Sequence, residues 1–139
     1  MPRGARPFRD TDTLRQIVRA CGLIEAFRVG LTFDAFAQDA KVWSATQYQI
    51  LVIGEAAHRL SDAFLALHAD IPWKDIQDMR NVLAHAYDLV RLDIVWHTAT
   101  VDIPQLRARL LPLLAALGAT DDPGIVETES MEESDGGGI

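Results

Sequence analysis

Apolar side chains recur every three to four residues along most of this chain, and nowhere do apolar and polar residues alternate for the length of a strand. The first periodic stretch ends at Gly30, and Asp10, Thr11 or Thr13 can cap its start. The residues expected on its core side are Leu14, Ile17, Val18, Cys21, Ile24 and Val29. This stretch predicts a long first helix.

The middle of the chain predicts a short helix and then a long one. Thr32 can cap the short helix through Phe33 and Phe36, and Asp39 or Ser44 can introduce the long one. The wide apolar side of the long helix marks it as central and is formed by Tyr48, Leu51, Val52, Ala56 and Leu60. Gly54 lies inside it at a cost of about 1 kcal/mol against alanine, so another helix is expected to approach closely there. Ser61 and Asp62 then close or restart the helix.

Two further helical stretches complete the pattern. Pro72 suits the first turn of a helix whose apolar side is Trp73, Ile76, Met79, Val82 and Leu83. From Leu92 to Leu117 the spacing is helical again, but Pro104 and Pro112 are expected to kink or split it before Gly118. The sequence predicts an all-α bundle of four to five helices.

Charge divides the chain into three parts. The formal net charge is −7, yet all of that excess lies in an acidic C-terminal tail, residues 119–139, that is expected to be disordered. Residues 1–9 form a basic N-terminal arm, and residues 10–118 form the predicted helical domain. The arm could contact phosphate, although a solvated end explains it as well.

Other counts narrow the class of protein. No apolar run is long enough to span a bilayer, and no signal peptide is evident, so a cytoplasmic protein without membrane partners is expected. Cys21 is the single cysteine and is expected to be a buried, inert thiol. His58, His68 and His97 are scattered without metal-ligand spacing, so no metal and no cofactor are expected.

The densest chemistry lies in one stretch that contains Arg80, Asn81, His85 and Tyr87. On a continuous helix Asn81 and His85 are neighbours one turn apart, and Arg80 and Tyr87 fall within about 20° of each other. Arg80 and His85, however, are about 140° apart. One helix could hardly direct both at one atom unless it bends or ends nearby, whereas a groove between two subunits could bring them together.

These side chains suit metal-independent RNA cleavage. His85 could take the proton from a ribose 2′-hydroxyl, Arg80 could stabilise the charged phosphorane, and Asn81 could orient His85 or hold a phosphate oxygen. A surface arginine, a capping asparagine and a hydrogen-bonded core histidine would give the same letters, so spacing alone leaves both interpretations open. Glu55 follows Gly54 on an apolar helix face, where burial would require an ion pair with Arg80 or another arginine.

The stretch from Tyr48 to Leu114 resembles the HepT family of HEPN-domain ribonuclease toxins. The family pattern R-x-x-x-x-H-x-Y is matched in register by Arg80, His85 and Tyr87, although Ala86 stands where many relatives have glycine. The resemblance extends to four blocks in the same order: Ile53-Gly54-Glu55-Ala56, Ile71-Pro72-Trp73, Arg80-Asn81 and Ile94-Val95-Trp96.

The resemblance implies a HEPN-like homodimer whose paired motifs line a cleft where RNA is cut without a metal. Arg80 and His85 would be catalytic, with Asn81 and Glu55 in support. It also implies a type VII-like toxin–antitoxin system, in which a cognate minimal nucleotidyltransferase antitoxin transfers AMP to Tyr87, and a larger hetero-oligomer with the antitoxin is an open alternative. Two other functions remain as alternatives: a non-catalytic helical partner of a nucleotidyltransferase, and a structural helical dimer.

Overall fold

The computed structural model describes residues 7–85 and 91–118, with the side chains of residues 9–80 and 91–118. Its four long helices are α1 (Pro7–Arg28), α3 (Ala40–His58), α5 (Trp73–His85) and α7 (Ile103–Ala116). The short segments are α2 (Phe33–Ala37), α4 (Asp62–Leu67), α6 (Leu92–His97) and a π-helical turn at Thr98–Asp102. The described residues contain no strand, so the predicted all-α architecture is confirmed.

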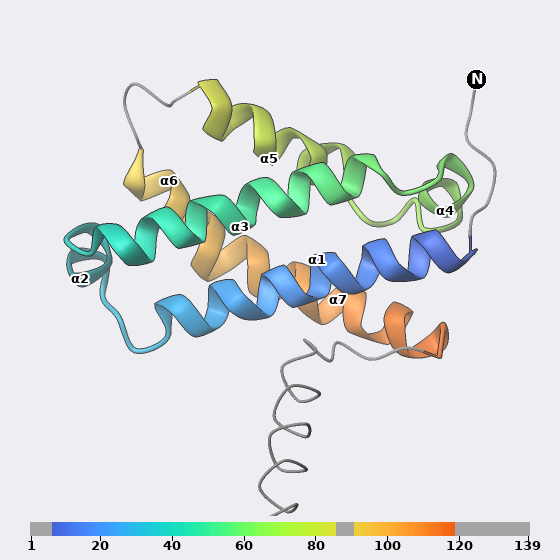
Figure 1. Cartoon of the computed structure of the whole chain (residues 1–139), viewed down its shortest axis with the longest axis horizontal. Helices are drawn as coiled ribbons and strands as arrows, with labels where there is room; N and C mark the ends of the chain where they lie inside the picture. The colour runs from blue at the N-terminus through green and yellow to red at the C-terminus, as the bar shows by residue number, and fades with distance from the viewer. Residues whose placement is uncertain (1–6, 86–90, 119–139) are drawn as a thin grey trace, which may run out of the picture.

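Helix α3 lies between two of the other long helices, as Figure 1 shows: α1 runs along one flank and α5 along another, whereas α7 packs beside α1. Helix α3 is therefore central, as the sequence predicts. None of the described helices combines the length and apolar character needed to cross a bilayer.

Most helix boundaries follow from local chemistry. Thr32, Asp39 and Ser61 begin α2, α3 and α4, and each side chain accepts a hydrogen bond from the backbone N–H three residues on, at 3.2, 3.3 and 3.1 Å respectively. Gly30 and Gly118 follow α1 and α7 with positive φ angles of 77° and 76°, the left-handed conformation in which a helix commonly ends. These residues confirm the predicted starts of α2, α3 and α4 and the predicted stops at Gly30 and Gly118.

The last helical stretch is divided, but not at a proline. The π-helical turn separates α6 from α7, Pro104 then sits in the first turn of α7, and Pro112 remains inside that helix. Proline is tolerated in a first turn because the N–H groups there have no intrahelical partner.

Helix α1 contributes much of the core. Leu14, Ile17, Val18, Cys21 and Ile24 are fully buried, as predicted. Burial raises the pKa of the Cys21 thiol to about 12, which agrees with an inert thiol. Val29 was placed wrongly on this core face: it follows the last residue of α1 and is 70% exposed.

The core face predicted for α3 is also partly wrong. Ala56 and Leu60 are buried, but Tyr48 is 62% exposed, and Leu51 and Val52 are only partly buried. The side that faces the core consists of Thr46, Ile50, Ile53, Gly54, Ala56 and Ala57. The error arises because the continuous apolar run from Ile50 to Ile53 carries no helical phase, so several faces fit the pattern equally well.

Asp10 does not cap a helix, contrary to prediction, and Thr11 and Thr13 do not either, because α1 begins at Pro7. Asp10 is instead 4% exposed and accepts hydrogen bonds from the Ser61 backbone N–H at 2.9 Å and from the Ser61 hydroxyl at 2.6 Å. Its carboxylate therefore ties the start of α1 to the cap of α4.

Replacing Asp10 should cost stability. Asp10→Ala leaves the buried Ser61 N–H without its acceptor, which should lower the free energy of unfolding by about 1–3 kcal/mol. Asp12→Ala is the matched control, because Asp12 is 75% exposed and forms an i, i+3 surface ion pair with Arg15. A change under about 0.5 kcal/mol is therefore expected. Urea denaturation measures both variants, and equal losses would contradict the role assigned to Asp10.

Candidate active site on helix α5

Close contact with α3 fixes the position of α5. A Cβ built on Gly54 would lie 3.1 Å from both the Cβ and the backbone nitrogen of Arg80, and 3.4 Å from the Ile76 carbonyl oxygen. A side chain of any size at position 54 would therefore push the two helices apart. This confirms the close helix approach predicted from a glycine inside a helix.

Arg80 is held at this contact by an ion pair. Its Nη1 atom donates a hydrogen bond to Oε1 of Glu55 at 2.8 Å, which confirms the predicted pairing. The predicted burial of Glu55 is wrong, however: its side chain is 51% exposed, and that of Arg80 is 37% exposed. Glu55 lies at the solvent edge of α3 because Ile53, Gly54 and Ala57 occupy the core side.

The geometry leaves Arg80 able to bind a substrate. Only one of its terminal nitrogens is engaged by Glu55 in the described contacts, so the rest of the planar guanidinium can donate to another oxyanion. The Arg80 hydrogen bond holds the pKa of the Glu55 carboxyl below its ordinary value. The carboxylate thus stays charged at neutral pH, and the attraction is lost only as pH falls through that lowered pKa.

The other predicted site residues are placed less completely. Helix α5 continues through Asn81 and His85, so their backbones lie one turn apart, as the spacing requires; their side chains lie outside the described set. The predicted angle of about 140° between Arg80 and His85 applies to this helix. Tyr87 lies outside the described residues.

A groove of about 260 Å³ borders Glu55 on the side away from the core. It is lined by Gln16, Tyr48, Leu51, Val52, Glu55 and Arg59. Arg59 donates a hydrogen bond to the Gln16 side chain, which links α3 to α1 across the groove. Tyr48 was predicted to lie in the core, and Arg59 was not predicted to line a site. The i, i+3, i+4, i+7 spacing of Tyr48, Leu51, Val52 and Glu55 is the sequence signal for this surface.

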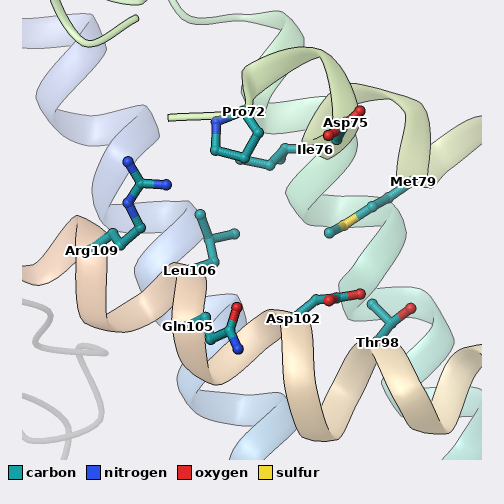
Figure 2. Close-up of a pocket in the computed structure, with 9 residues that line it drawn as sticks. All are labelled: Pro72, Asp75, Ile76, Met79, Thr98, Asp102, Gln105, Leu106 and Arg109. Carbon is teal, nitrogen blue, oxygen red and sulfur yellow. The ribbon is translucent and has the colours of Figure 1, made fainter. Parts of the chain in front are cut away.

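A second slot, of about 320 Å³, separates α5 from the π-helical turn and α7 (Figure 2). Ile76, Met79 and Leu106 give it an apolar interior, with Asp102 and Thr98 at one end and Arg109 at the other. Arg109 is already bound to Asp70, with hydrogen bonds of 2.7 Å to its carbonyl oxygen and 3.1 Å to its carboxylate. Of the two predicted site residues whose side chains are described, neither Glu55 nor Arg80 lines the slot.

No group of three or more His, Cys, Asp or Glu side chains with the arrangement of a metal site occurs among the described residues. The chemistry available at the α3–α5 contact is thus that of a guanidinium and a carboxylate, with an imidazole further along the same helix.

The fold and this motif define a helical-bundle protein with an R-x-x-x-x-H sequence on a helix that packs against α3. The sequence profile of the family described as "Ribonuclease HepT-like" matches residues 17–112, so the chain belongs to the HepT-like ribonuclease family. The match confirms the resemblance to HepT proteins and the predicted enzyme class, an endoribonuclease.

Individual relatives agree with this assignment. A Thermococcus cleftensis protein named "Probable ribonuclease HepT" is 37% identical over 98 residues, which cover 70% of this chain and 89% of that protein. A protein of Caldanaerobacter subterraneus subsp. tengcongensis, named only as a candidate RNase, is 32% identical over 101 residues, 73% of this chain and 90% of its own length. No solved structure matches.

Proposed function

We propose that this chain is the toxin of a type VII-like toxin–antitoxin pair and cuts RNA without a metal ion. The observation that carries the proposal is the partly exposed guanidinium of Arg80, which forms an ion pair with Glu55 of α3. Arg80 shares α5 with His85, and both lie within the region matched by the ribonuclease family. The cytoplasm, where RNA is available, is the proposed site of action.

The proposed reaction is an internal transfer at phosphorus. His85 takes the proton from a ribose 2′-hydroxyl, and the 2′-oxygen attacks the adjacent phosphorus. The bond from phosphorus to the 5′-oxygen then breaks, the 5′-oxygen takes a proton, and the products carry a 2′,3′-cyclic phosphate and a 5′-hydroxyl. Arg80 stabilises the charge on the phosphorane, Glu55 positions Arg80, and Asn81 orients His85.

The proposed active form is a homodimer. Arg80 and His85 diverge by about 140° on one helix, so one chain can hardly direct both at the same phosphate. In a dimer, Arg80 of one chain and His85 of the other can face the same RNA. The groove beside Glu55 supports this arrangement, since it exposes Tyr48 and parts of Leu51 and Val52 next to Glu55, the ion-pair partner of Arg80. The same surfaces can take part in a larger hetero-oligomer with the antitoxin.

Incubating the purified protein with RNA tests the reaction. Fragments ending in a 2′,3′-cyclic phosphate should form at the same rate with and without EDTA. Intact RNA after incubation with unmodified protein would contradict the proposed activity and would favour a non-catalytic partner of a nucleotidyltransferase.

Control by the antitoxin is proposed to act through Tyr87, where AMP adds bulk and negative charge beside the RNA site. After coexpression with a minimal nucleotidyltransferase, intact mass should increase by a whole number of AMP units. Tyr87→Phe should abolish the increase, whereas Tyr48→Phe should retain it. Tyr48 is a demanding control because it is the other tyrosine of the chain and is 62% exposed. An increase that is lost with Tyr48 would overturn the assignment.

A further inference from the structure

Two tryptophans that both fit the helical pattern have different surroundings. Trp73 is 6% exposed, donates its indole N–H to the His68 carbonyl oxygen at 2.9 Å, and packs against the Phe64 ring at 6.0 Å. It is a core residue, as predicted. Trp96 is only partly buried, and its indole N–H makes no hydrogen bond to a described residue.

Trp96 and Phe33 form an aromatic ledge backed by the core. The Trp96 ring lies 4.9 Å from the ring of Phe36, which is fully buried, and 6.2 Å from the ring of Phe33, which is 38% exposed. The interplanar angles, 51° and 62°, are those of tilted and edge-to-face pairs. Thr32 caps α2 immediately before Phe33, so the exposed Phe33 ring extends from a helix start that a hydrogen bond stabilises.

The ledge lies on the motif side of the bundle. Figure 1 shows α2 and α6 at the end of the molecule toward which the C-terminal end of α5 points. Helix α6 begins at Leu92, and the seven residue steps from His85 to Leu92 can span at most about 25 Å. A strand of RNA bound at the motif could therefore reach the ledge.

We propose that the aromatic ledge of Phe33 and Trp96 binds an unstacked nucleobase of the RNA substrate, a few nucleotides from the cleaved bond. Single-stranded RNA is commonly held by bases stacked on aromatic side chains, and a base also offers acceptors to an indole N–H. The partly exposed Phe33 ring lies beside an indole N–H that no described residue engages, and the two together match both needs. This inference rests on the proposed ribonuclease function and adds a binding subsite to it.

The test measures binding of a short RNA whose 2′-hydroxyls are methylated, so that it cannot be cut. Phe33→Ala should weaken binding about tenfold, as loss of one stacked base does. Phe33→Leu should weaken it similarly, because leucine keeps the apolar volume but has no ring face. Leu67→Ala is the matched control, since Leu67 is 77% exposed on α4, and it should bind like the wild type. Circular dichroism establishes that each variant is folded.

A base deletion scan locates the contact. A set of RNAs is made, each lacking the base at one position. The RNA that lacks the base bound by the ledge should bind wild type and Phe33→Ala with equal affinity, whereas every other RNA should bind Phe33→Ala more weakly than wild type. Binding of the intact RNA should also quench tryptophan fluorescence, and Trp96→Phe should remove that change.

The outcomes separate the two proposals. Equal binding by Phe33→Ala and wild type, full rescue by leucine, or a loss that no abasic position cancels would overturn the ledge while leaving the ribonuclease proposal in place. A changed oligomeric state in Phe33→Ala would assign the ledge to contact between copies of the chain and overturn it as well. If the wild type neither binds nor cuts any RNA, both proposals fall.

Discussion

His85→Ala should reduce RNA cleavage by at least about 100-fold without changing the fold, because the 2′-hydroxyl loses its base in the proposed reaction. His85 is the last residue of α5, and alanine, the best helix former, is compatible with that helix. Single-turnover cleavage of a labelled RNA, with protein in excess, measures the chemical step. Thermal unfolding of the variant should match that of the wild type.

His97→Ala is the control for this experiment. Its side chain is 67% exposed on α6, and its nearest ionic partner is Asp102 at 3.8 Å, so it should retain full activity. Residual cleavage by His85→Ala at the wild-type rate would show that another group removes the proton. An equal loss in His97→Ala would show that the assay responds to any histidine and not to the proposed base.

Arg80 gives an independent check on the same site. Arg80→Lys retains a positive charge but loses the planar fork, so partial activity is expected, whereas Arg80→Ala should lose about 100-fold or more. Glu55 is exposed to solvent, so removing its partner leaves no buried charge behind. The fold should therefore survive both substitutions. Identical rates for the lysine and alanine variants would mean that charge alone does not explain the contribution of Arg80.

The sequence could predict the elements whose signals are local. Thr32, Asp39 and Ser61 cap helices by accepting a hydrogen bond from the backbone N–H three residues on. Gly54 indicates a close helix contact because glycine is costly inside a helix. The ion pair of Glu55 with Arg80 was also predicted, although the burial from which it was predicted is wrong, since Glu55 is 51% exposed. Each of these signals involves one residue and one physical cost.

Long-range partners were beyond such reasoning. Asp10 has the position and residue type of a helix cap, but its carboxylate accepts hydrogen bonds from Ser61. The two residues are far apart in sequence, so no local pattern predicts the contact. The phase of α3 was missed because its apolar run has no period, and the groove with Tyr48 and Arg59 was missed with it. Trp96 fits the same helical spacing as Trp73, so only the packing of Phe33 and Phe36 distinguishes the two.

Gly54→Leu should both destabilise the protein and impair cleavage, because the α3–α5 contact leaves no room for a side chain. Even a Cβ would sit 3.1 Å from the backbone nitrogen of Arg80, and backbone cannot rotate away as a flexible side-chain end can. We expect a loss of about 3 kcal/mol in the free energy of unfolding, the upper part of the range for overpacked cores. The displaced helix should misplace Arg80 and slow cleavage about 100-fold, as small shifts in catalytic geometry do.

Gly22→Ala is the matched control, since Gly22 also lies inside a long helix but has space around it. A Cβ there would meet only the side chain of Arg107, with the nearest atom, Nε, at 3.6 Å, an ordinary contact. Alanine should therefore stabilise α1 by up to about 1 kcal/mol through its better helix propensity. Gly54→Ala gains the same propensity but forces the helices apart, so it should be less stable than Gly22→Ala. Urea denaturation of the two alanine variants decides between crowding and propensity: equal stabilisation of both would show that α3 and α5 can separate freely, and the position of Arg80 would then not depend on Gly54.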